Sequence, residues 1–149
     1  MDVWFYHLQS RPLEAVLPSL VERSLGRGWK VVVEVGGAER MASLDDHLWT
    51  YADDSFLPHV TMADPEAATS PVVLTTGQDN ANGAQVRFCV DGARIPDVLQ
   101  PYERVVLMFD GDDPEALAAA RGDWRKLKAA GTDASYWQQD DTGRWEKKA

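Results

Sequence analysis

Short apolar runs, each separated from the next by a segment with helical periodicity, constrain the fold of this chain more than any other feature. Val31–Val33 and Val105–Phe109 are unbroken apolar runs, whereas a strand with one solvated face would alternate apolar and polar residues. Strands buried on both faces are typical of parallel sheets that are covered by helices. The 149-residue chain is therefore predicted to form a single-domain α/β fold, a mostly parallel sheet flanked by helices.

The same patterns give the expected elements in chain order. The predicted strands are Val3–His7, Trp29–Val35, Val72–Thr75, Gln85–Val90, Val105–Phe109 and a possible edge strand Ser135–Gln138. The first predicted helix carries Leu13, Val16, Leu17, Leu20, Val21 and Leu25, the second carries Met41, Leu44 and Leu48, and the third is Pro114–Ala130. Pro18 predicts a kink in the first helix, or a helix that begins later than Pro12. Asp53–Ser70 is predicted to be a loop and Asp140–Ala149 a loose polar tail, apart from Trp145.

Composition excludes several classes of protein. The net charge of -9 and the sequence pI of about 4.7 argue against nonspecific wrapping of DNA, so any contact with nucleic acid is expected to be local or indirect. The longest apolar run is too short to span a membrane, and residues 1–8 lack the pattern of a secretory signal. The single cysteine, Cys89, fits a reducing compartment. These features predict a cytoplasmic protein.

The third predicted helix concentrates cations around an indole ring. Leu117, Arg121, Trp124, Arg125 and Lys128 follow the spacing i, i+4, i+7, i+8 and i+11, so they share one helix face. Such a strip suits an anionic ligand with an apolar end. Periodicity alone leaves a second interpretation open, in which Trp124 belongs to the buried stripe of an ordinary amphipathic helix and the cations are solvated.

An enzymatic interpretation is suggested by Asp110, because an acid after an apolar strand resembles the magnesium-binding strand of nucleotide triphosphatases. That chemistry also needs a glycine-rich loop before a helix, and the segment 26–28 instead precedes a strand. Asp110, Asp112 and Asp113 are better explained as residues that cap the next helix. The three histidines lack the spacing of a zinc site, so neither a catalytic residue, a metal nor a cofactor is predicted.

Several segments, taken together and in order, resemble the chi subunit of bacterial DNA polymerase III holoenzyme. They are Phe5–Leu8, Leu44–Tyr51, Ser55–His59, Ala120–Arg125 and Tyr136–Gln139. The resemblance extends over nearly the whole chain, and its most specific part is the central element that runs from Leu48-Trp49 to Ser55-Phe56-Leu57-Pro58-His59.

The resemblance implies a fold like that of mononucleotide-binding domains without the phosphate loop. It implies a noncatalytic adaptor that joins the clamp loader, through the psi subunit where one is present, to the acidic C-terminal tail of single-stranded-DNA-binding protein. That tail ends in a phenylalanine, so it offers both carboxylates and a ring. By position, the family's tail-binding residues match Arg121, Trp124 and Arg125, with Lys128 as a further cation, Phe56 at the rim, and Leu117 where some relatives carry a basic residue.

Three questions stay open from the sequence. Trp124 and Phe56 can each belong to the pocket or to the core. The surface that would contact psi is unmarked, apart from the first helix and the pair Trp4 and Trp29. Two other functions compete with the adaptor, an orphan nucleotide-binding enzyme and a direct binder of single-stranded DNA.

Overall fold

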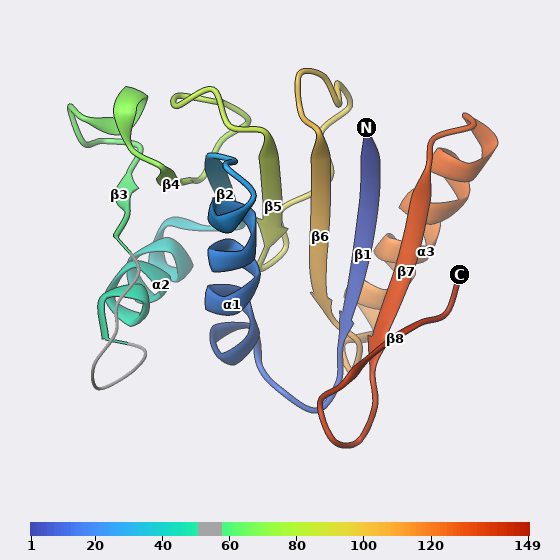
Figure 1. Ribbon diagram of the computed structural model, residues 1–149. Helices are drawn as coiled ribbons and strands as arrows, with labels where there is room; N and C mark the ends of the chain where they lie inside the picture. The colour runs from blue at the N-terminus through green and yellow to red at the C-terminus, as the bar shows by residue number, and fades with distance from the viewer. Residues whose placement is uncertain (51–57) are drawn as a thin grey trace.

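The computed structural model describes residues 1–50 and 58–149, whose strands form one sheet in the order β3-β4-β2-β5-β6-β1-β7-β8 (Figure 1). All neighbouring strands are parallel except β7 and β8, which are antiparallel. The strands are β1 (Asp2–Leu8), β2 (Val31–Val35), β3 (Val60–Thr61), β4 (Val72–Thr75), β5 (Val86–Val90), β6 (Arg104–Asp110), β7 (Ala134–Gln139) and β8 (Trp145–Lys147). The helices are α1 (Leu13–Gly26), α2 (Ala38–Thr50), α3 (Pro114–Ala129) and the short 3-10 helix η1 (Ala67–Thr69). The predicted α/β class with a mostly parallel sheet is confirmed.

The helices form layers on both faces of the sheet. α1 and α2 pack on one face, and their apolar side chains join a core that includes alternate residues of β1, β2, β5 and β6. α3 and the segment 93–102 pack on the other face, where Phe5 and Val32 contribute to a second core. In Figure 1, α1 lies in front of the sheet and α3 behind it. Every residue of β2, β4 and β5 is buried, so the apolar run Val31–Val33 is covered on both faces. The polar residues of these strands, Glu34, Thr75 and Arg87, are buried as well.

α1 begins at Leu13, directly after Pro12, and is continuous through Pro18. Proline has no N–H to donate to the carbonyl of Glu14, one turn earlier. In this protein the Nε2 atom of His47, on α2, lies 2.7 Å from that carbonyl oxygen and donates to it. The contact between α1 and α2 thus provides the hydrogen bond that the helix cannot make internally.

The structure corrects the predictions for two segments. The segment Asp53–Ser70 is not only loop, because it contains β3, too short at two residues to show a period, and η1. The tail Asp140–Ala149 is not loose, because Asp140 accepts hydrogen bonds from the backbone of Thr142 and Arg144 and turns the chain into β8. β7 is consequently not an edge strand, since it lies between β1 and β8.

Candidate functional site

α3 carries most of the predicted site, and its ends follow from local chemistry. The Asp113 side chain caps the helix by accepting hydrogen bonds from the backbone N–H groups of Glu115 and Ala116, at 3.0 and 3.4 Å. The predicted capping role of Asp113 is confirmed. Gly131, with φ of 75°, follows the C-terminal end of the helix, where a residue without Cβ adopts the left-handed conformation most easily.

The sequence left open whether Trp124 belongs to the core or to the predicted binding surface, and the structure shows that it contributes to both. Its ring is half-buried and packs edge to face against Phe5 and Tyr136, with centroids 5.4 and 5.9 Å apart. Leu117 packs against the same core and is also half-buried. The Nζ atom of Lys128 lies 5.0 Å from the centroid of the Trp124 ring, within range of a cation–π interaction. Trp124 therefore anchors the helix to the sheet and still borders the surface.

The cations of this face are exposed. Within residues 1–50 and 58–149, Arg121, Arg125 and Lys128 form no ion pair with a carboxylate. We call Leu117, Arg121, Trp124, Arg125 and Lys128 the α3 strip. No acid among the described residues pairs with these cations, although the chain has a net charge of -9.

Two residues that the sequence interpretation did not assign to this site, His7 and Tyr136, extend the α3 strip. The Nδ1 atom of His7 lies 2.8 Å from the Tyr136 hydroxyl, and both rings pack near Phe109. Burial lowers the pKa of His7; Asp112 opposes this shift and Arg121 adds to it. Burial raises the pKa of Tyr136, and Arg121 partly opposes it. The sequence offered only one signal for this cluster, because both residues lie in segments that resemble the chi family.

Phe56, the remaining predicted site residue, lies outside the described residues. The elements that flank it in sequence, α2 and β3, contribute to the opposite face and to the edge of the sheet farthest from β8. The α3 strip, as the structure describes it, is therefore composed of Leu117, Arg121, Trp124, Arg125 and Lys128, with His7 and Tyr136 beside it.

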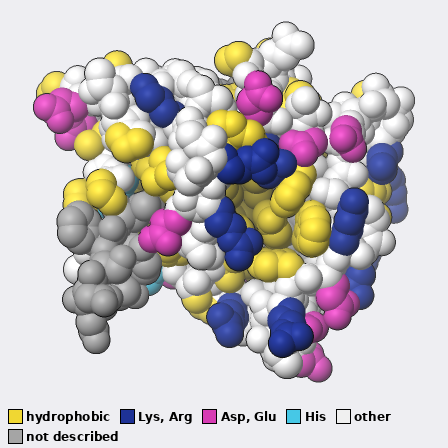
Figure 2. Space-filling model, in the orientation of Figure 1, with side chains coloured by type: hydrophobic (Ala, Val, Ile, Leu, Met, Phe, Trp, Pro, Cys, Tyr) yellow, Lys and Arg dark blue, Asp and Glu magenta, His cyan; other side chains and the backbone are white. Residues whose placement is uncertain are grey.

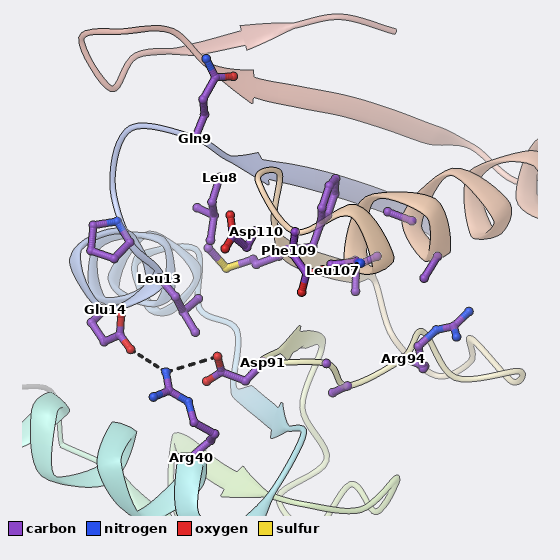
Figure 3. Close-up of a pocket in the computed structure, with 18 of the residues that line it drawn as sticks. Leu8, Gln9, Leu13, Glu14, Arg40, Asp91, Arg94, Leu107, Phe109 and Asp110 are labelled. Atoms are coloured by element: carbon purple, nitrogen blue, oxygen red, sulfur yellow. Dashed lines mark hydrogen bonds and ion pairs between the residues drawn. The ribbon is translucent and has the colours of Figure 1, made fainter.

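A cavity of about 640 Å³ lies at the carboxyl ends of β1 and β6, where parallel α/β sheets commonly bind ligands (Figure 3). β1 leads through α1 toward β2, whereas β6 leads through α3 to β7, so the chain leaves these neighbouring strands in opposite directions. Two of the three arginines that line this cavity, Arg40 and Arg94, are paired with carboxylates, whereas the third, Arg11, forms no ion pair with a described residue. Arg40 lies 2.8 Å from Glu14 and 3.3 Å from Asp91, and Arg94 lies 2.8 Å from Asp123.

This cavity does not suit a nucleotide phosphate. The turn from β1 to α1 is Gln9-Ser10-Arg11-Pro12, which contains no glycine, and the ring of His7 occupies the space beside Gly111 after β6. Asp91 and Asp123 each have a buried carboxylate oxygen for which the described part of the chain offers no hydrogen-bond partner. A phosphate placed there would meet these like charges. Among the described residues, this cavity thus lacks a glycine-rich turn of the kind that binds phosphate.

No group of three or more His, Cys, Asp or Glu side chains is placed to hold a metal ion in residues 1–50 and 58–149. Within the same ranges, no helix is both long enough and apolar enough to cross a bilayer.

Comparison with known proteins identifies a family for this chain. A probable DNA polymerase III subunit chi from Rickettsia prowazekii (strain Madrid E) is 25% identical over 111 residues, which cover 70% of this chain and 67% of that protein. The family model described as DNA polymerase III chi subunit, HolC, matches residues 1–135, a range that includes the whole α3 strip. The chain therefore belongs to the DNA polymerase III chi subunit family.

Proposed function

We propose that this chain is a noncatalytic accessory subunit of the replicative DNA polymerase III complex, and that its α3 strip binds the acidic C-terminal tail of single-stranded-DNA-binding protein. The same subunit would connect that protein to the clamp loader, directly or through a psi subunit, so that its contact with DNA is mainly indirect. Family membership supports the polymerase complex, and the α3 strip supports the tail.

One observation carries the proposal for the tail. Arg121, Arg125 and Lys128 are exposed and without a described carboxylate partner. They share a helix face with Trp124, and the Nζ atom of Lys128 lies 5.0 Å from the centroid of its ring. An acidic peptide that ends in an aromatic residue would offer carboxylates to the cations and its ring to the indole. Arginine binds carboxylates with two parallel hydrogen bonds, so Arg121 and Arg125 are expected to orient the tail.

The affinity is expected to be modest. Exposed ion pairs contribute about 1 kcal/mol or less each, so a few of them with one aromatic contact give binding in the micromolar range. Leu117 stands where some relatives carry a cation, so this chain would depend more on apolar contact. Several tails on one oligomeric partner would raise the overall strength by multivalency.

The test is a calorimetric titration of the full chain with a short acidic peptide ending in Ile-Pro-Phe, at low and at high salt. Binding should be near micromolar at low salt and weaker at high salt, because exposed charges are screened over about 8 Å at physiological ionic strength. Arg121→Ala should weaken it about tenfold or more, since hydrogen bonds to charged groups contribute about 1.5–3 kcal/mol. Lys128→Ala should reduce the affinity less than Arg121→Ala does.

Lys126 provides a matched control, because it is an exposed cation of the same helix that lies off the α3 strip. Lys126→Ala should leave the affinity within about twofold of the original. A peptide whose terminal phenylalanine is replaced by alanine should bind weakly, and an oligothymidine should not bind. Equal losses in the Arg121 and Lys126 variants, or no binding at low salt, would contradict the proposed pocket.

A further inference from the structure

A second hollow combines cations with aromatic rings, on the face of the sheet opposite α3. It encloses about 510 Å³ between α1 and the strands β6 and β1. Its floor is apolar and includes Phe88, Val106 and Leu20. Figure 2 shows hydrophobic side chains gathered in this hollow with Lys and Arg side chains around them. We call this hollow the α1 groove.

Among the described residues, three arginines and no carboxylate line the α1 groove. They are Arg23 and Arg27 from α1 and Arg104 from β6. Arg104 pairs with Asp2 at 3.1 Å, but neither Arg23 nor Arg27 forms an ion pair with a carboxylate of the described residues. In a chain of net charge -9, this local excess of positive charge over an apolar floor is complementary to an acidic, partly apolar ligand.

The aromatic rings of the α1 groove are already in contact with neighbouring groups. The guanidinium of Arg104 lies 3.8 Å from the Trp4 centroid and 5.3 Å from that of Trp29, while Trp137 stacks against Trp4 from the β7 side at 5.4 Å. Tyr6 is buried and packs against Trp145 at 4.6 Å. Single-stranded nucleic acid binds by stacking bases on free ring faces. The engaged rings and the acidic chain disfavour that ligand and favour a peptide.

We propose that the α1 groove is a docking site for an acidic segment of another protein, whose carboxylates pair with Arg23 and Arg27 and whose apolar side chains cover Phe88, Val106 and Leu20. The inference rests on the groove itself and does not depend on the tail proposed for the α3 strip. Because α1 and α3 pack on opposite faces of the sheet, the two surfaces can be occupied at the same time.

The experiment selects peptides from a display library of random dodecapeptides on the full chain, and then on the double variant Arg23→Glu, Arg27→Glu. The expected result is a class of peptides that rely on the groove and combine Asp or Glu with Leu, Phe or Trp. A labelled, C-terminally amidated member of this class should bind at least tenfold more weakly to the double variant. Arg121→Glu, on the other face, should change its affinity less than twofold.

Arg23 and Arg27 are exposed, so the double variant is expected to fold, and its circular dichroism and melting temperature provide the check. The proposal is overturned if no selected peptide depends on Arg23 and Arg27, or if the dependent peptides lack acidic residues. It is also overturned if the dependent ligand proves to be oligothymidine, or a second copy of the chain seen as a dimer in sedimentation that the double variant abolishes.

Discussion

The α3 strip and the α1 groove use the same residue types and are supported by the same strand, yet they differ in shape. Phe5 points from β1 toward α3 and supports Trp124, whereas its neighbour Trp4 points to the other face and borders the groove. On α3 the cations are exposed on a helix above a half-buried ring. In the groove they line a hollow with an apolar floor.

Composition alone therefore does not define a binding surface. A convex helix face presents charge with little apolar area, which favours weak and salt-sensitive contacts. A hollow removes more apolar surface from water per ligand residue, and each 100 Å² of apolar area contributes about 2.5 kcal/mol before the costs of association. We therefore expect the groove to depend less on salt than the α3 strip.

The largest expected effect comes from truncating Phe5, the buried side chain that supports the α3 strip. Phe5 is fully buried beneath Trp124 and Tyr136, so Phe5→Ala should lower the free energy of unfolding by about 3–5 kcal/mol. Urea denaturation measures this change. Trp4→Ala, at a half-buried position on the same strand, is the comparison and should cost less; the reverse order would mean that the groove side carries more of the stability.

The second prediction exchanges charge on each surface in turn. Arg121→Glu should lower the affinity for the Ile-Pro-Phe peptide more than tenfold, because it replaces an attractive contact with a repulsive one. Arg23→Glu should change the affinity for this peptide less than twofold. Comparable losses in a calorimetric titration would show that the acidic tail does not distinguish the two surfaces.

The third prediction adds a cation to the α3 strip. Leu117→Lys adds a fourth cation to this helix face and should raise the affinity for the Ile-Pro-Phe peptide about two- to fivefold at low salt. The gain should shrink at high salt. Leu117→Met, which keeps an apolar side chain of similar volume, serves as the control and should leave the salt dependence unchanged.

The smallest effect concerns pH. The pKa of His7 is lowered in the folded protein, mainly by burial, so between that value and about 6.5 the unfolded chain binds more protons. The stabilising contribution of neutral His7 is present above about pH 6.5 and is lost as the pH falls through the range between the unfolded and folded pKa values. When the pH is lowered from about 7.5 to about 5.5, the free energy of unfolding should therefore fall less in the His7→Gln variant than in the original chain. Urea denaturation at the two pH values measures this change. Equal losses would exclude His7 as the cause.

Much of the fold could be predicted from residue patterns. Val31–Val33 and Val105–Phe109 marked buried parallel strands correctly, since burial on both faces leaves a continuous apolar run. β3 could not be predicted, because a strand of two residues shows no period. β8 could not be predicted either, because it pairs with β7 through residues of mixed polarity. The membership of Trp124 in the helix face was predictable, whereas its partners Phe5 and Tyr136 were not.

The class of fold, the helix face that carries the cations and the family resemblance could all be predicted, because they depend on local periodicity and motif. Three other features arise from tertiary contacts: the half-buried position of Trp124, the placement of His7 and Tyr136 near Arg121, and the gathering of Arg23, Arg27 and Arg104 around one hollow. These are relations between β1, β6, β7 and helices distant in the chain. They depend on strand order, which local patterns do not encode.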